Sequence, residues 1–207
     1  MYIILMSVSV EYSTKEISAI VLTNVLKMCK RRNLIDNVNS MIENIKDDFI
    51  NKGIIEFNIK DNKKISVYQF TGKVASIVQG SPLDDYLKNF VDVHKIVIMK
   101  EPTKRSAKQI TSEYPNVEFF FEYEMMEDIP SKMFIPEHIL LLDDEKKDFL
   151  QIFKESELAK INDTDIMSRY YAAKVGDIFK IVRPSLSAGK NIFYRKVVLG
   201  NLNQLFE

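Results

Sequence analysis

One stretch near the C-terminal end organises this sequence, and it reads DTDIMSRYYAAKVGDIFKIVRPSLSAGKNIFYRKVVL from Asp163 to Leu199. Asp163 precedes a run without Gly or Pro, which predicts a short helix with Asp163 as its N-cap and Gly176 as the residue that ends it. Residues 178–182 and 192–199 are rich in β-branched and aromatic side chains, which predicts two strands. The polar residues between them predict a hairpin that presents a surface.

The hairpin loop holds Ser-Ala-Gly-Lys at residues 187–190, a run similar to the end of a phosphate-binding loop. That motif needs a Gly five residues before its Gly-Lys pair and a Ser or Thr after it. Pro184 and Asn191 stand at those two positions. We therefore exclude a phosphate-binding loop and expect Pro184 to close the first strand of the hairpin.

The order and spacing of several short motifs in this stretch resemble the C-terminal domain that the fifth subunit of eukaryotic nuclear RNA polymerases shares with its smaller archaeal counterpart. Two upstream segments, residues 135–141 and the acidic helix start at 143–147, resemble the beginning of that domain. The sequence departs from the family where Ile166, not Pro, follows Asp165. The motifs are Arg169-Tyr170-Tyr171, Lys174-x-Gly176-Asp177, Lys180 to Ser185, Ser187 to Lys190, and Tyr194-Arg195.

The resemblance implies that this domain docks onto the largest polymerase subunit and touches other subunits. It identifies residues that we expect at those subunit interfaces. They are His138, Arg169, Tyr170, Tyr171, Gly176, Arg183, Ser187, Gly189, Lys190, Tyr194 and Arg195.

A weaker resemblance extends through the N-terminal half. The apolar strand Lys95 to Met99 followed by Ser106-Ala107-Lys108-Gln109 is similar to the jaw domain of the eukaryotic members, which implies a position beside downstream duplex DNA. Residues 100–108 carry four basic side chains against one acidic one, a local excess of three charges. A basic loop beside a helix N-terminus suits phosphate groups. We expect the DNA-proximal residues to be Lys104, Arg105, Ser106 and Lys108.

Composition limits the class of protein. The chain has 207 residues, 46% of them hydrophobic and 28% charged, and its 29 basic and 29 acidic side chains cancel. A neutral chain is not typical of a free-standing nucleic-acid binder. The one cysteine, Cys29, allows no internal disulfide and lies on the apolar side of a helical pattern, where we expect a buried thiol. Met1 to Val10 is apolar but too short to span a membrane, and we expect it to pack as a strand or a helix lead-in.

The fold class that we predict is α/β (α+β). Helices and strands alternate through residues 1–134, which predicts an N-terminal jaw-type domain with a mixed sheet. Residues 135–207 form a small C-terminal mixed α/β domain, and the boundary lies between Asp128 and Pro136. In the first domain we expect helices after the Ser13/Glu16 capping box, over Met41 to Ile50 with an end near Gly53, at Pro82 to Val91 and at Ser106 to about Tyr114.

Two charged segments are interpreted as solvated surface. The first is Lys30-Arg31-Arg32-Asn33 at the end of the first predicted helix, where phosphate contact is the alternative. The second is the acidic run of Glu118, Glu122, Glu124, Glu127 and Asp128, which lacks the Gly turn or His partner typical of a metal site. His94 and His138 stand alone in sequence and are interpreted as structural.

Three functions remain in competition. The first is a non-catalytic subunit of a DNA-directed RNA polymerase, present once per assembly, without a cofactor and without a membrane contact. The second is a metal-dependent nuclease built on Glu56 and Lys60, with Asp84 or Asp85 as the companion acid. The third is a stand-alone protein-binding adaptor. If the polymerase is cellular, we expect this protein in the nucleus. If it belongs to a cytoplasmic large DNA virus, we expect this protein in the host cytoplasm and the virion.

Overall fold

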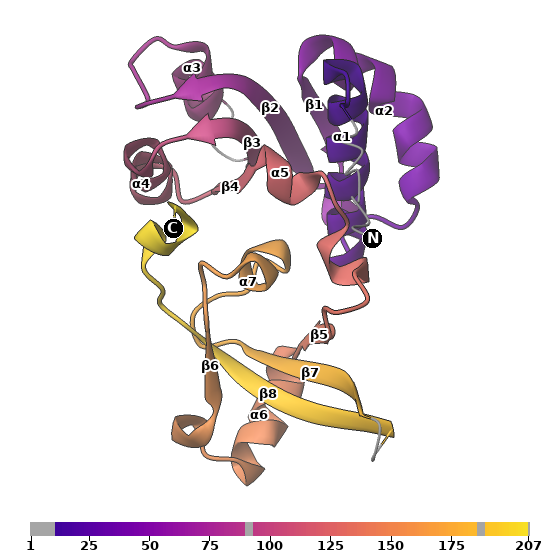
Figure 1. The fold of residues 1–207 in the computed structure, drawn as a ribbon, viewed down its shortest axis with the longest axis vertical. Helices are drawn as coiled ribbons and strands as arrows, with labels where there is room; N and C mark the ends of the chain where they lie inside the picture. The colour runs from indigo at the N-terminus through magenta and orange to yellow at the C-terminus, as the bar shows by residue number, and fades with distance from the viewer. Residues whose placement is uncertain (1–10, 90–92, 186–188, 207) are drawn as a thin grey trace, which may run out of the picture.

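The computed structural model describes residues 11–89, 93–185 and 189–206, and it has two lobes (Figure 1). The larger lobe holds a four-stranded sheet in the order β1-β2-β3-β4, and the smaller lobe holds a second sheet in the order β5-β7-β8-β6. Both α-helices and mixed sheets are present, so the predicted α/β (α+β) class is confirmed. No helix in the described part of the chain has the length and hydropathy needed to cross a membrane. The expectation for Met1 to Val10 lies outside the described residues.

The first sheet is mixed, as predicted. β1 and β2 are antiparallel, whereas the β2–β3 and β3–β4 pairs are parallel. Ile96 and Ile98 of β3 are buried against one layer of helices, and Val97 and Met99 are buried against the other. Burial on both faces explains why this strand is a continuous apolar run. The strands are β1 (Ile54–Asn58), β2 (Lys64–Val74), β3 (His94–Pro102) and β4 (Val117–Phe121).

Helices cover both faces of this sheet (Figure 1). α1 (Thr14–Arg31) begins at the predicted capping box, in which the Glu16 carboxylate accepts from the Ser13 amide at 2.8 Å. α2 (Val38–Lys52) ends at Gly53, whose φ of 69° suits glycine. Cys29 is fully buried in this layer, as expected, and burial raises the pKa of its thiol to about 12. The opposite layer is α3 (Pro82–Lys88) and α4 (Lys104–Glu113).

The second sheet contains the predicted hairpin. β7 (Ile178–Ser185) and β8 (Gly189–Val198) are antiparallel, and Pro184 pairs with Lys190 inside the ladder. The expectation that Pro184 closes the strand is therefore wrong, because its missing N–H does not prevent pairing near a strand end. α6 (Asp143–Ile152) covers one face of this sheet through Phe149, which stacks on Tyr194 at 4.3 Å. The outer strands are β5 (Glu137–Leu140) and β6 (Ala159–Asn162).

The helix of the Arg-Tyr-Tyr motif is shorter than predicted. α7 runs over Ile166–Tyr170 with Asp165 as its N-cap. Asp163 instead accepts a hydrogen bond from the Gly200 amide at 2.7 Å. The turn after the helix is made by Ala172, whose φ is 52°, so Gly176 does not end the helix although its own φ of 96° is left-handed.

Short segments complete the fold. α5 (Glu122–Met125) follows β4, and turns of 3-10 helix lie at Lys60–Asn62, Ile129–Ser131, Glu155–Glu157 and Leu202–Phe206. The last of these, η4, returns to the larger lobe beside α4 (Figure 1). There Phe206 packs edge-on against Phe121 with ring centroids 5.4 Å apart. The C-terminal segment thus helps to bury the core of the larger lobe.

Candidate interaction surfaces and the joint between the lobes

The basic segment at residues 100–108 is not a loop. Lys100 lies in β3, and Lys104 to Lys108 form the start of α4, with Thr103 as the N-cap. Ser106 completes a capping box: its amide donates to the Thr103 hydroxyl at 3.3 Å, and its own hydroxyl accepts from the Thr103 amide at 3.0 Å. Ser106 is fully buried. Its hydroxyl therefore caps the helix, and the proximity of Ser106 to DNA stays a prediction.

The other basic side chains of this segment lie at the surface. Lys104, Arg105 and Lys108 are exposed, and none of them forms an ion pair with the residues that the structure describes. Three unmatched cations thus lie close together on one helix start, where the backbone amides add partial positive charge. This arrangement suits a poly-anion such as a nucleic-acid backbone.

Arg169 holds the smaller lobe against the edge strand of the larger one. Its guanidinium donates to both carboxylate oxygens of Glu124 at 2.7 Å and to the Phe119 carbonyl at 3.0 Å. Glu124 also accepts from the Phe121 amide at 2.8 Å. The Arg169 and Glu124 side chains are 12% and 8% exposed. The pair therefore occupies backbone groups on the open edge of β4, which protects that edge from other strands.

Arg32, in the turn after α1, binds the end of α7. It donates to the carbonyls of Tyr170 and Arg169 at 2.8 Å each, which adds charged donors to the carbonyls at the C-terminal end of this short helix. Its other bonds go to the Glu118 carboxylate at 2.6 and 2.9 Å. Burial alone would raise the pKa of Glu118, but the hydrogen bond with His94 and the charge and hydrogen bonds of Arg32 hold it at about 2.

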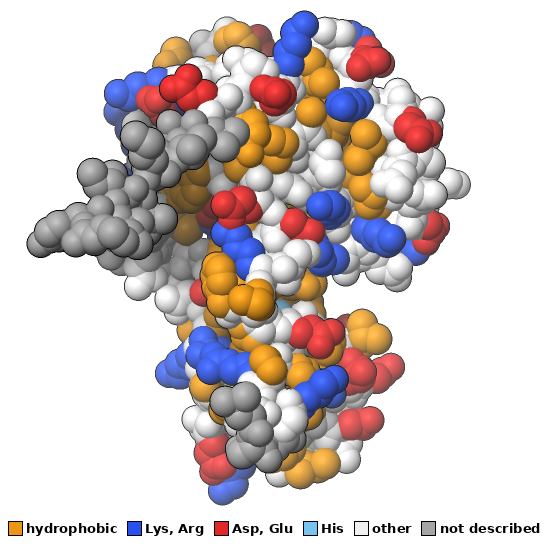
Figure 2. Space-filling view, turned by 45° about the vertical axis from the view of Figure 1, so that its right-hand side comes forward, with side chains coloured by type: hydrophobic (Ala, Val, Ile, Leu, Met, Phe, Trp, Pro, Cys, Tyr) orange, Lys and Arg blue, Asp and Glu red, His pale blue; other side chains and the backbone are white. Residues whose placement is uncertain are grey.

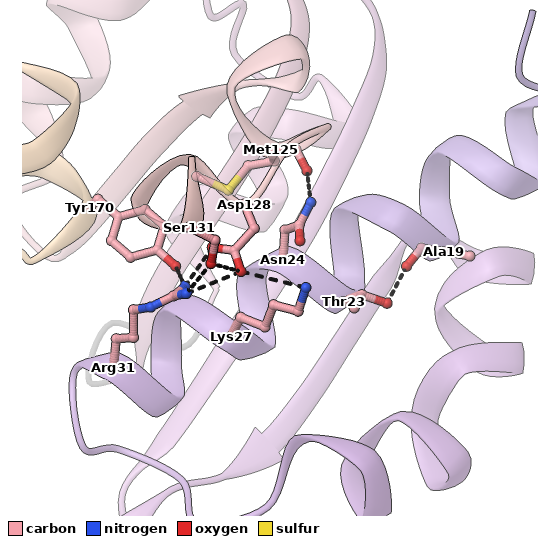
Figure 3. Close-up of polar contacts among 9 residues, drawn as sticks. All are labelled: Ala19, Thr23, Asn24, Lys27, Arg31, Met125, Asp128, Ser131 and Tyr170. Atoms are coloured by element: carbon pink, nitrogen blue, oxygen red, sulfur yellow. Dashed lines mark hydrogen bonds and ion pairs between the residues drawn. The ribbon is translucent and has the colours of Figure 1, made fainter. Parts of the chain in front are cut away.

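Arg31 forms the third contact between the lobes (Figure 3). It donates to Asp128 at 2.6 and 3.1 Å and to the Tyr170 hydroxyl at 2.6 Å. Ser131 accepts from it at 2.8 Å, and Lys27 lies 3.5 Å from Asp128. Although burial opposes ionisation, the hydrogen bonds from Arg31 and Ser131 hold the pKa of Asp128 below its usual value. We call Arg31, Arg32 and Arg169 with their carboxylates the arginine joint.

The arginine joint overturns two expectations. Arg31 and Arg32 are neither a solvated helix end nor phosphate ligands, because both bind α7 across the lobe boundary. The acidic run is not a solvated linker, because Glu118, Glu124 and Asp128 are the partners of the three arginines. Each pair joins residues 45 to 97 positions apart. The available signal in the sequence was a compact basic run matched by a compact acidic run.

Several residues that we expect at subunit interfaces are packed against other residues of this same chain. Tyr170 is 2% exposed and belongs to the core of the larger lobe, and Tyr171 packs at the edge of that core and against Phe179. Burial raises the pKa of Tyr170 to about 12, although the charge and hydrogen bond of Arg31 lower it. Arg169 and Tyr170 therefore help to position the two lobes within this chain. Their contact with another subunit stays a prediction.

The hairpin residues divide into packed and exposed groups. Tyr194 stacks against Phe149, and Arg195 is half-buried. Arg183 is exposed and lies over the Phe193 ring at 5.1 Å. Gly189, with a φ of 71°, and Lys190 are exposed beside the loop, whereas Ser187 lies outside the described residues. The exposed members of this group remain candidates for contact with another chain.

The two histidines have internal partners. His94 shares a hydrogen bond of 2.7 Å with Glu118, and a ring nitrogen of His138 lies 2.7 Å from the Pro136 carbonyl. Burial lowers the pKa of His138 although the Pro136 carbonyl favours its charged form. His138 also packs edge-on against Phe179 at 5.7 Å. Both contacts agree with a structural role.

The residues expected for a nuclease do not converge. Lys60 is paired with Asp36 at 2.8 Å, and Asp84 is paired with Lys88 at 2.8 Å. Among the described residues no group of three or more His, Cys, Asp or Glu side chains is arranged to hold a metal ion.

Comparison with known proteins decides the family. Residues 127–197 match the model of the RNA polymerase Rpb5 C-terminal domain. The subunit rpabc1 of DNA-directed RNA polymerases I, II and III from Dictyostelium discoideum is 34% identical over 149 residues, which cover 67% of this chain and 75% of the relative. The chain belongs to the RNA polymerase subunit 5 family.

Two further relatives of this subunit 5 chain differ in how much of it they match. Subunit 5 of the RNA polymerase of Acanthamoeba polyphaga mimivirus is 28% identical over 190 residues, 86% of this chain and 91% of the relative. Subunit Rpo5 of Archaeoglobus fulgidus is 41% identical over 68 residues, which cover 32% of this chain and 90% of the relative. The expected resemblance is confirmed, and with it the class of non-catalytic polymerase subunit.

Proposed function

We propose that this subunit docks onto the largest subunit of its RNA polymerase through residues 135–207, while residues 1–134 support the channel for downstream DNA. The observation that carries the docking role is the number of large apolar side chains exposed on the smaller lobe. Clusters of exposed apolar side chains mark interaction surfaces. The exposed apolar side chains of the smaller lobe include Leu142, Ile152, Phe153, Ile192, Phe193 and Leu199, which are between 42% and 79% exposed.

Charge supports this division of labour. From Pro136 to Glu207 the chain has eleven basic residues (eight Lys, three Arg) and eleven acidic ones, so this part is neutral. A neutral surface with exposed apolar side chains suits a protein partner better than a phosphate backbone. A group of three cations without an ion pair among the described residues lies instead at the start of α4 in the other lobe.

The docking proposal is tested by Ile192→Asp in the full chain, co-expressed with the other polymerase subunits. Ile192 is 48% exposed on β8, so the substitution leaves the core intact and places a charge in the proposed interface. We expect loss of co-purification with the largest subunit. The matched control is Val78→Asp, which puts the same charge on an apolar side chain 62% exposed in the larger lobe. Equal retention of both variants, with unchanged circular dichroism, refutes docking through this surface.

The DNA role is carried by Lys104, Arg105 and Lys108. Contacts between basic side chains and phosphates give affinity that falls with salt and does not depend on base sequence. A photoreactive residue at Arg105 should crosslink to downstream duplex in a transcribing complex that contains one copy of this subunit. The isolated subunit should bind duplex poorly, because three cations release few counterions. Absence of the crosslink from an active complex refutes the DNA role.

The place of the protein in the cell follows from its polymerase. Relatives occur among eukaryotic nuclear-type polymerases and in mimivirus. A cellular polymerase places this subunit in the nucleus, and a cytoplasmic viral polymerase places it in the host cytoplasm and the virion. Mass spectrometry of a native purification, which identifies the co-purifying subunits, distinguishes the two.

A further inference from the structure

The outer side of β5 is an unpaired strand edge. β5 stands first in the sheet order, so it has a neighbour only on the β7 side. The Leu141 amide donates to the Ile178 carbonyl, and Ile139 lies opposite Lys180 two residues earlier. In an antiparallel pair the bonded positions alternate, so the backbone groups of His138 and Leu140 point away from β7. No backbone hydrogen bond from either residue to another element occurs among the described residues.

This edge forms one wall of a groove between the lobes. The groove has a volume of about 1160 Å³, and every residue of β5 lines it. The facing wall comes from the turn after α1 and from the β1–β2 hairpin, including Leu34, Ile59 and Lys63. Figure 2 shows a narrow waist between the two lobes. An unpaired edge beside a groove of this size can accept an extended segment of another chain.

The charges in the groove point to the chemistry of that segment. Arg31 and Arg32 line it but are neutralised by Asp128 and Glu118. Lys63 and Lys174 also line it, are exposed, and form no ion pair with described residues. Glu137, at the start of β5, is the one groove acid without a basic partner among those residues. The groove therefore has an excess of positive charge beside apolar walls, which favours an acidic partner segment.

We propose that an extended acidic segment of another polymerase subunit adds as a strand to β5. This inference rests on the proposed function, since it names the form and charge of a segment that the docked partner supplies. The partner's backbone bonds the free amides and carbonyls of His138 and Leu140. Its alternate side chains place an apolar group beside Ile139, which is 38% exposed, and acidic groups toward Lys63 and Lys174.

Hydrogen exchange at single-residue resolution tests the strand, with the isolated full chain compared with the assembled polymerase. The amides of Ile139 and Leu141 point to β7 and should be protected in both states. The amides of His138 and Leu140 should exchange quickly in the isolated chain and slow by about tenfold or more on assembly. If these two amides exchange equally fast in an assembled polymerase, strand addition is overturned while docking stands. If the chain does not co-purify with the polymerase at all, both proposals fail.

Two matched variants separate the backbone from the side chain. His138→Pro and His138→Ala both lose the imidazole ring, but only the proline removes the outward amide and blocks the edge. Proline is tolerated on a strand where the N–H faces away from the ladder. We expect His138→Pro to reduce co-purification with the other subunits about tenfold relative to His138→Ala, with circular dichroism unchanged. Equal recovery of the two overturns the proposal.

Charge and identity are tested in the same assembly. Lys63→Glu combined with Lys174→Glu should weaken assembly, whereas Lys73→Glu, an exposed residue on β2 outside the groove, should not. A photoreactive residue at Ile139 should crosslink to an acidic peptide of another subunit, identified by mass spectrometry. A crosslink to nucleic acid or to a second copy of this chain overturns the proposal.

Discussion

Two groups of basic side chains in this subunit look alike in sequence and differ in the fold. Arg31, Arg32 and Arg169 are matched by carboxylates at 2.6 to 2.7 Å, and each also takes part in a contact across the lobe boundary. Lys104, Arg105 and Lys108 are exposed and unmatched by the described residues. The first group is used to hold the two lobes together, and the second is left for a partner. What separates them is the presence of distant acids, which local charge does not reveal.

The largest effect is expected at the most buried pair of the joint. Arg169→Ala leaves the Glu124 carboxylate buried without a counter-charge and frees the Phe119 carbonyl on the β4 edge. Removal of one partner of a buried pair costs about 3–5 kcal/mol of unfolding free energy. Denaturant unfolding of the full chain measures it, with Arg105→Ala as the exposed arginine control. A loss of unfolding free energy below about 1 kcal/mol would show that water replaces the Arg169 guanidinium. Arg169 would then stabilise the fold no more than an exposed basic side chain does.

The pair of Arg32 and Glu118 gives a pH dependence of similar size. The pKa of Glu118 is about 2 in the fold against 4.5 for a free carboxyl. A lowered pKa means that its contribution is complete above pH 4.5 and is lost as the pH falls toward 2, about 3 kcal/mol in all. Chemical denaturation between pH 2 and 6 should show this loss. In Glu118→Gln the dependence should be flatter, whereas Glu157→Gln, exposed in a 3-10 turn, should keep the parent slope.

A smaller effect is expected at the pair of Arg31 and Asp128, which taken together is nearer to solvent than the other two pairs. The Asp128 side chain is 16% exposed and that of Arg31 is 29% exposed, so water screens this pair more than the other two. Asp128→Asn keeps the shape and removes the charge, and should cost about 1–2 kcal/mol of unfolding free energy. The cost should fall in high salt. If Asp128→Asn cost as much unfolding free energy as Arg169→Ala, the strength of these ion pairs would not depend on how deeply they are buried.

Local sequence patterns predicted the elements of each lobe well. The Ser13/Glu16 capping box, the double-sided strand at Ile96 to Met99 and the glycine at the end of α2 each express a rule that operates within a few residues. The family motifs likewise identified the hairpin of the smaller lobe. These features are set by propensity, periodicity and turn chemistry, which neighbouring residues determine.

The contacts between the lobes could not be predicted in the same way. Asp163 and Asp165 are equally good N-caps in sequence, and only the fold assigns Asp163 to the Gly200 amide and Asp165 to α7. The arginines of the joint find acids 45 to 97 positions away, so their burial depends on packing between lobes. The free edge of β5 also required the strand order, which no local pattern supplies.

The smallest effect on stability is expected at the start of α4, and it is the sharpest test of the contrast. Replacement of Lys104, Arg105 and Lys108 by Ala removes no ion pair with a described residue, so unfolding free energy should change by no more than about 0.5 kcal/mol per site. The same variant should weaken the grip of the assembled polymerase on duplex. If all three cations contact phosphates, the slope of log affinity against log salt should become shallower by about 2.7. Lys46→Ala, an exposed lysine on α2 without an ion pair among the described residues, is the control that should leave that slope unchanged. If the triple variant were destabilised, these cations would contribute to the stability of the fold. If the salt slope were unchanged, they would be solvated surface without a role in DNA binding.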